Sequence, residues 1–170
     1  MIPVCRAATL LHHTDRWLSA WSRCPAVVRW LLPLLVAGLL WWSSSRSPEP
    51  SAPSVVRALL LNGMHVVAYA ALAVAIRLAL ANPASRTWAW PRETAALVLS
   101  VAYGVVDELH QGEVPGRVCS ASDVLTDVAG AVFGLLLLAA GRRIPVGWSR
   151  LVAAFLVGLA CAVNATFASW

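Results

Sequence analysis

Charged side chains are scarce in this sequence. Only 12% of its 170 residues are Asp, Glu, Lys or Arg, whereas a soluble domain carries about 25%. Lysine is absent, so all thirteen basic residues are arginines. Apolar residues make up 59% of the chain, and the mean hydropathy is +0.71. This composition predicts an integral membrane protein, and it gives no nucleic-acid footprint because the arginines lie mostly beside apolar runs.

Three patterns that define other classes of protein are also missing. The four cysteines have no paired spacing such as Cys-x-x-Cys, which argues against a zinc site and a disulfide framework. No small-x-small cleavage site follows the first apolar run, which argues against a signal peptide. No polar linker longer than about a dozen residues separates the apolar runs, so a second domain is not expected. We therefore expect one transmembrane bundle over residues 25–170, preceded by an N-terminal segment of residues 1–24.

The apolar runs predict an all-α fold, a polytopic transmembrane bundle of four to five helices, because each is near the length of about 20 residues that crosses the bilayer core. The expected spans are 25–42, 55–81, 93–111, 120–140 and 151–167. The last run contains Asn164 and Thr166, so it either spans the membrane or lies flat on it. Residues 1–24 interleave apolar and charged residues at helical spacing, which fits a cytoplasmic or interfacial helix and equally a disordered basic tail.

The arginines predict the orientation of the chain. With the N-terminus in the cytoplasm, ten arginines lie on the cytoplasmic side and only Arg46, Arg57 and Arg117 lie on the other. Cytoplasmic flanks retain basic residues, so this orientation is predicted. Most tryptophans also fall at predicted span ends, where indole prefers the headgroup level. The polar stretch of residues 107–117 is therefore expected on the outer side of the membrane.

This polar stretch anchors a candidate pocket. Asp107, His110 and Gln111 are spaced i, i+3 and i+4, which places them on one face of a helix. Two further predicted helices carry polar pairs spaced i, i+4, and a rise of about 1.5 Å per residue brings all three sets into the outer third of the bilayer. The candidate pocket consists of His65, Tyr69, Asp107, Glu108, His110, Gln111, Arg117, Asp123 and Asp127.

Two interpretations of this cluster compete. A carboxylate in lipid costs about 2.5 kcal/mol or more, so the acids are expected to meet inside the bundle. They either form an outward-opening polar pocket, or cap helix ends and pair with Arg117 to pin two helices together. One pair would suffice for pinning, which favours the pocket. Arg117 itself fits two roles equally well, pairing with the carboxylates or binding a phosphate.

Single residues carry different expectations. Asp107 and Asp127 are the deepest acids and suit acid–base chemistry or a cation anchor, whereas Asp123 better fits a helix start capped by Ser120. His65, His110, Asp107 and Asp127 would make a sensible divalent-metal set. Their spacing is not a metal motif, however, and a histidine bonded to a neighbouring acid is commoner, so no metal site is predicted and the cofactor is left open.

Several motifs, taken in order, resemble the VanZ-like family of small bacterial membrane proteins over roughly residues 35–140. They are His65-x-x-x-Tyr69, Asp107-Glu108-x-x-Gln111, Pro115-Gly116-Arg117, and Ser120 through Asp123 to Gly130-Ala131 and Gly134. Gly130 and Gly134, four residues apart, also predict a close-packing helix face. Asp127 stands where relatives often carry Asn, which disfavours a metal or proton role for it. The N-terminal segment and the last span fall outside the resemblance.

The resemblance implies a multi-pass protein of the bacterial cytoplasmic membrane and cell envelope. The founding member of the family is associated with resistance to teicoplanin, a lipid-bearing glycopeptide antibiotic. No activity is transferred by the resemblance, and it leaves open whether the protein is an enzyme. The implied partners are membrane lipids and a lipid-linked cell-wall intermediate or a lipoglycopeptide.

Two functions follow as hypotheses. In the first, the outer pocket binds the head group of an amphiphile without turnover, with Arg117 on a phosphate or carboxylate and the acids on amines or hydroxyls. In the second, the protein is a membrane enzyme acting on a lipid-linked substrate, with Asp107 or Glu108 as base. Ion conduction is disfavoured, because the acids gather near one face and the inner halves of the spans are almost purely apolar.

Overall fold

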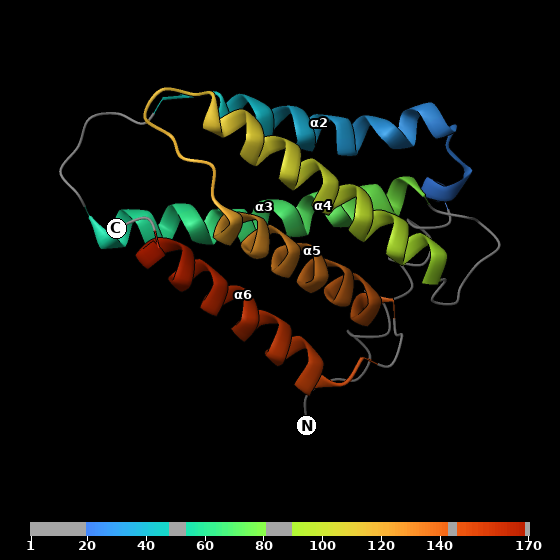
Figure 1. Cartoon of the computed structure of the whole chain (residues 1–170). Helices are drawn as coiled ribbons and strands as arrows, with labels where there is room; N and C mark the ends of the chain where they lie inside the picture. Colours follow the sequence, from blue (N-terminus) through green and yellow to red (C-terminus); the bar gives the residue numbers. More distant parts are fainter. Residues whose placement is uncertain (1–19, 48–53, 81–89, 143–145, 169–170) are drawn as a thin grey trace.

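The computed structural model describes residues 20–47, 54–80, 90–142 and 146–168. Over these ranges the chain forms long helices and no strands, which confirms the all-α prediction (Figure 1). The helices are α2 (Ala26–Ser44), α3 (Val55–Ala79), α4 (Trp90–Gly112), α5 (Ala121–Gly141) and α6 (Trp148–Ala168). Each lies within a few residues of a predicted span. The interfacial helix predicted for residues 1–24 falls almost entirely outside the described residues.

Four of these helices are long and apolar enough to cross a membrane: α2, α3, α5 and α6. The protein is therefore a multi-pass membrane protein. Helix α4 falls short of that apolar criterion because ionisable residues lie near both of its ends, among them Glu93, Asp107 and Glu108. All three of these acids are buried, so α4 presents them to the bundle and not to its surroundings.

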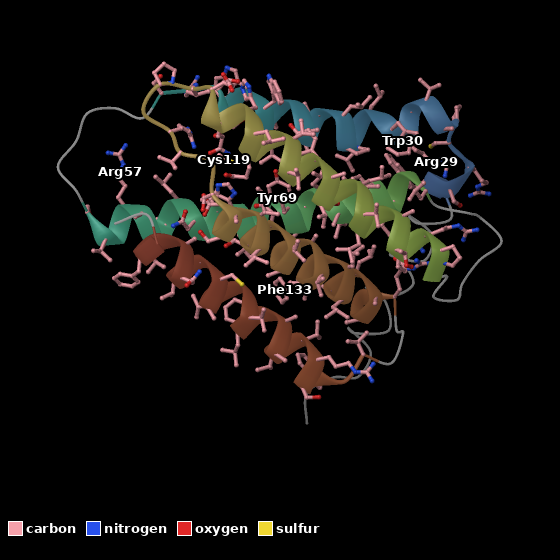
Figure 2. The ribbon with its side chains drawn as sticks, in the orientation of Figure 1. Arg29, Trp30, Arg57, Tyr69, Cys119 and Phe133 are labelled. Carbon is pink, nitrogen blue, oxygen red and sulfur yellow. The ribbon has the colours of Figure 1, made fainter. Side chains whose placement is uncertain are left out.

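The last helix packs against α3 and α5 (Figure 1). Asn62 on α3 donates a hydrogen bond from Nδ2 to Oγ1 of Thr166 at 3.0 Å. Phe133 of α5 lies between α5 and α6 (Figure 2), and its ring centroid is 5.7 Å from that of Phe155 on α6. The sequence left open whether this segment spans or lies flat, and these contacts favour a helix that runs beside α3 and α5.

Successive helices alternate in direction (Figure 1). Helices α2, α4 and α6 therefore finish where α3 and α5 begin, and we call this end of the bundle the polar end. Arg57 lies near the polar end and Arg29 lies near the opposite end (Figure 2). This separation of the arginines agrees with the sequence analysis, while the assignment of the polar end to the outside stays a prediction.

Helices α3 and α5 form the tightest contact of the core. A methyl group added at Gly130 would collide with the backbone of Val66, and one added at Gly134 would lie 2.5 Å from the carbonyl oxygen of Ala70. The predicted close-packing face is confirmed, because only residues without a side chain fit there. The contact fixes the register between α3 and α5, and with it the relative positions of the polar residues one turn away.

A buried ion pair lies at the end opposite the polar end. Nε of Arg77, near the end of α3, donates to Oε2 of Glu93, in the first turn of α4, at 2.6 Å. Their side chains are only 3% and 6% exposed. Burial, followed by repulsion from Arg77, lowers the pKa of nearby Arg142 at the end of α5. This pair was not predicted from the sequence, which placed Arg77 at this end of the bundle but named no partner for it, and it adds two buried charges to spans whose inner halves were expected to be almost purely apolar.

Candidate functional site

The predicted acids meet at the polar end, between α3, α4 and α5. Asp107, Glu108 and Asp127 are each at most 2% exposed. Nδ1 of His65 on α3 lies 2.9 Å from Oδ1 of Asp127 on α5, which makes the histidine–acid pair that the sequence favoured. Gly104 on α4 permits this approach, since a methyl group there would lie 2.9 Å from Oδ2 of Asp127. Three helices thus contribute to one polar centre.

Glu108 ties α4 to the start of α5. Its Oε2 accepts a hydrogen bond from the backbone N–H of Ser120 at 2.9 Å. The side chain of Ser120 caps α5 by accepting from the backbone N–H of Asp123, as predicted. In a capping box, the acid three residues after the cap, which is Asp123 here, accepts a hydrogen bond from the backbone N–H of the cap residue. In this structure Glu108 accepts that hydrogen bond from Ser120 instead. The carboxylate of Asp123 lines a cavity in its place.

Gln111 links the acids to the arginine. Its Nε2 donates to Oδ2 of Asp107 at 3.1 Å and to Oε1 of Glu108 at 3.3 Å, while its Oε1 accepts from Nη1 of Arg117 at 3.1 Å. An amide is suited to this position because it presents donors to carboxylates and an acceptor to a guanidinium. The four side chains form one connected network.

Arg117 reaches its position through a tight turn. The N–H of Arg117 bonds to the carbonyl of Val114, and Gly116 has a φ of 81°. Proline at the second position and a left-handed glycine at the third are the features of a type II turn. From this turn Arg117 donates to the carbonyls of Ser43 and Arg46 at the end of α2. A cation suits the negative end of a helix, so Arg117 fastens α2 to the polar centre.

His110 is the one predicted pocket residue that the structure sets apart. Its ring stacks on Trp41 of α2 with 3.9 Å between centroids, and its Nε2 lies 2.9 Å from Oγ of Ser45. A residue three positions after Asp107 points roughly 60° away from it around a helix with 3.6 residues per turn. That rotation carries His110 onto α2, so the metal set that included it is not assembled.

A cavity of about 500 Å³ opens beside the polar centre. Five of the predicted pocket residues line it: His65, Asp107, Gln111, Arg117 and Asp123. Tyr69, Glu108 and Asp127 lie behind this wall and are almost completely buried. The opposite wall comes from α2 and includes Val36, Leu39, Leu40, Ser43 and Ser44. This wall was not predicted from the sequence, because the candidate pocket was chosen from polar residues and the α2 wall is mostly aliphatic.

The polar centre holds more negative than positive charge. Four carboxylates face the guanidinium of Arg117 and the imidazole of His65. Three buried oxygen atoms, Oη of Tyr69, Oδ1 of Asp107 and Oδ2 of Asp127, have no hydrogen-bond partner among the described residues. Ligand atoms of His65, Glu108 and Asp127 lie within 4.8 Å of one another, a spacing near that of a metal site. Among the described residues, this is the group that could hold a metal ion.

Residues 9–142 match the model of a protein family described as VanZ/LLP1. The chain belongs to the VanZ family. The match begins well before residue 35, where the sequence resemblance was expected to start, and therefore takes in α2 and part of the N-terminal segment. Helix α6 lies beyond the VanZ match, as expected. No curated protein and no solved structure matches the chain.

Proposed function

We propose that this VanZ-family protein binds the head group of an amphiphilic envelope lipid or lipoglycopeptide in the cavity at its polar end. The observation that carries the proposal is the mixed wall of the cavity. One side presents carboxylates and a guanidinium, and the other presents the aliphatic side chains of α2. A molecule with a charged head and an apolar chain satisfies both walls at once.

The shape of the cavity supports an elongated ligand. Its lining on α3 runs from Leu61 to Ala71, which is about 15 Å along the helix axis at about 1.5 Å per residue. Helix α2 on the other side buries only Pro33 and Ser44 completely. The middle of α2 is held by the hydrogen bond that Oη of Tyr103 donates to the carbonyl of Ala37 at 2.6 Å. Its exposed aliphatic side chains, such as Leu39, give an acyl chain a surface to lie against.

The charges in the wall favour a head group that carries both signs. Arg117 offers a guanidinium to a phosphate or carboxylate. Asp107 and Asp123 line the same cavity and accept hydrogen bonds from amines or hydroxyls. A purely anionic head would meet an excess of carboxylates, so a zwitterionic phospholipid or the amine-bearing head of a lipoglycopeptide fits better.

Thermal unfolding of the purified full chain in detergent tests this binding. A ligand at about 100 times its Kd stabilises a protein by about 2.7 kcal/mol, which raises the midpoint of a chain of this size by about 5–10 °C. We expect such a shift with phosphatidylethanolamine or teicoplanin and a smaller one with phosphatidylglycerol. The Asp123→Asn variant removes a charge-assisted hydrogen bond and should weaken binding roughly 10-fold or more.

The His110→Gln variant is the matched control, because His110 contacts α2 outside the cavity. The proposal fails if no ligand shifts the midpoint, or if His110→Gln weakens binding as much as Asp123→Asn. A deletion strain complemented with wild type or Asp123→Asn then tests the resistance link. Equal teicoplanin sensitivity of the deleted and complemented strains would overturn that link.

A second function, modification of a lipid-linked substrate, is favoured by the His65–Asp127 pair. His65 lines the cavity, and Asp127 behind it holds the ring as a carboxylate does for a histidine base. In this role His65 would act as the base in a reaction that changes the head group of a lipid-linked substrate. Envelope lipid extracts that are the same from cells with wild type, His65→Gln and no gene would count against it.

The outward orientation is testable with cysteines. Cys119 is exposed in the segment between α4 and α5 at the polar end, and Gly141 is exposed at the opposite end. In intact cells, a membrane-impermeant maleimide should label a chain whose sole cysteine is Cys119. It should label a cysteine-free chain carrying Gly141→Cys only after the membrane is opened. The reverse labelling pattern would mean that the orientation is opposite to the predicted one, with the cavity on the cytoplasmic side.

A further inference from the structure

We propose that His65, Glu108 and Asp127 bind one divalent transition-metal ion beside the cavity. The three ligands come from α3, α4 and α5, so the ion would join the helices that carry the polar centre. This inference does not depend on amphiphile binding. A metal site is compatible with the binding protein described above, whereas it would replace the His65 base of the enzyme. It can be measured without either ligand or substrate.

The spacing of the ligand atoms is close to what a metal needs. Zinc binds histidine nitrogen and carboxylate oxygen at about 2.0–2.2 Å, which sets ligand atoms about 3.4 Å apart in a tetrahedron. The candidate atoms of His65, Glu108 and Asp127 lie within 4.8 Å of one another, and Nδ1 of His65 is 2.9 Å from Oδ1 of Asp127. Small rotations of side chains would close the remaining gap.

Buried oxygens without partners point independently to a bound cation. Asp127 is 1% exposed, yet its Oδ2 has no hydrogen-bond partner among the described residues, and the same holds for Oδ1 of Asp107. A buried carboxylate oxygen without a partner costs free energy. A cation bound by Asp127 supplies a partner for this carboxylate and offsets two of the negative charges that Arg117 leaves unpaired.

The surrounding residues hold the ligands as a metal site requires. Glu108 accepts hydrogen bonds from the N–H of Ser120 and from Gln111, which fix the direction of its carboxylate. Such partners around a metal ligand orient it and strengthen binding. His65 lines the cavity, so an open coordination position would face the space in which a ligand or substrate binds.

The ligand types decide which ions are suited. Mg²⁺ and Ca²⁺ prefer oxygen ligands alone, whereas an imidazole favours Zn²⁺ and its transition-metal neighbours. Asp127 stands where relatives in the resemblance often carry Asn, which in the sequence disfavoured a metal role for it. A neutral Asn side chain would bind the ion more weakly than a carboxylate does. The proposed site therefore depends on the negative charge of Asp127.

Calorimetric titration of the chelator-treated full chain with Zn²⁺ tests the site. Wild type should bind one ion per chain. Loss of a residue that merely supports a metal ligand costs about 10–100-fold in affinity, so His65→Gln, Glu108→Gln and Asp127→Asn should each lose at least about 100-fold. Each replacement is close in shape to the natural residue, and Asp127→Asn removes a buried charge, so monodisperse elution of the variants is expected.

Two controls make the outcome decisive. His110→Gln removes an imidazole at the same end of the bundle but outside the cluster, and it should bind Zn²⁺ as wild type does. Excess Mg²⁺ should not compete with Zn²⁺. The proposal is overturned if wild type binds no Zn²⁺, if Asp127→Asn and Glu108→Gln retain wild-type affinity, or if His110→Gln loses as much. The lipid-dependent thermal shift is measured separately and survives any of these results.

Discussion

Replacing Glu93 with alanine is expected to lower the free energy of unfolding by about 3–5 kcal/mol, the usual cost of removing one partner of a buried ion pair. The guanidinium of Arg77 would lose its bond to Oε2 of Glu93 while it stays almost completely buried. Repulsion from nearby Arg142 would add to this cost. The loss should appear as a lower midpoint in thermal or denaturant unfolding of the chain in detergent.

The double variant Arg77→Met/Glu93→Met distinguishes the cost of leaving Arg77 buried without its acid from the net contribution of the whole ion pair to stability. Two apolar side chains of similar length avoid the desolvation of both ions, and such replacements are often neutral or stabilising. We therefore expect the double variant to unfold near the wild-type midpoint. Glu113→Ala is the matched control, because Glu113 is exposed and its loss should change stability by less than about 0.5 kcal/mol. A double variant as unstable as Glu93→Ala would mean that the pair itself stabilises the bundle.

The ion pair also clarifies the role of the polar end. Arg77 and Glu93 hold α3 and α4 together where the two helices are consecutive in the chain, with one acid matched to one arginine. At the polar end the acids outnumber the cations, with four carboxylates against one guanidinium and one imidazole. One pair suffices to pin two helices, so the excess at the polar end supports binding over a purely structural role.

The spans were predictable because they depend on local composition. Apolar runs of suitable length became α2, α3, α5 and α6, and the i, i+4 spacing on α3 and α5 placed His65 and Asp127 at one depth, where the structure pairs them. The cap at Ser120 was equally local. Each of these features can be derived from a few neighbouring residues and the geometry of a helix.

Contacts between helices were not predictable in the same way. His110 was grouped with Asp107 by spacing, but the rotation of α4 against α2 sends its ring to Trp41. Glu108 reaches the N–H of Ser120 only because the intervening turn brings the start of α5 back to α4. Both outcomes depend on how whole helices are rotated and placed, which residue spacing within one helix does not specify.

Gly130→Ala tests the contact that sets this placement. The added methyl group would collide with the backbone of Val66, and backbone cannot rotate away as a side chain can. Overpacking of this kind typically costs 1–3 kcal/mol, so a loss of about 3 kcal/mol is expected in thermal unfolding. Gly63→Ala is the matched control, because Gly63 is also helical and has open space around it. Alanine there should be neutral or stabilise the helix by up to about 1 kcal/mol.

The same variant should also disturb the polar centre. Val66 follows His65 directly on α3, and Gly130 lies one turn after Asp127 on α5, so a shift that relieves the collision moves the two ligands apart. Zn²⁺ affinity should then fall in Gly130→Ala and stay at the wild-type value in Gly63→Ala. An unstable Gly130→Ala that still binds Zn²⁺ as tightly as wild type would contradict this coupling. It would mean that the polar centre keeps its geometry independently of the α3–α5 contact.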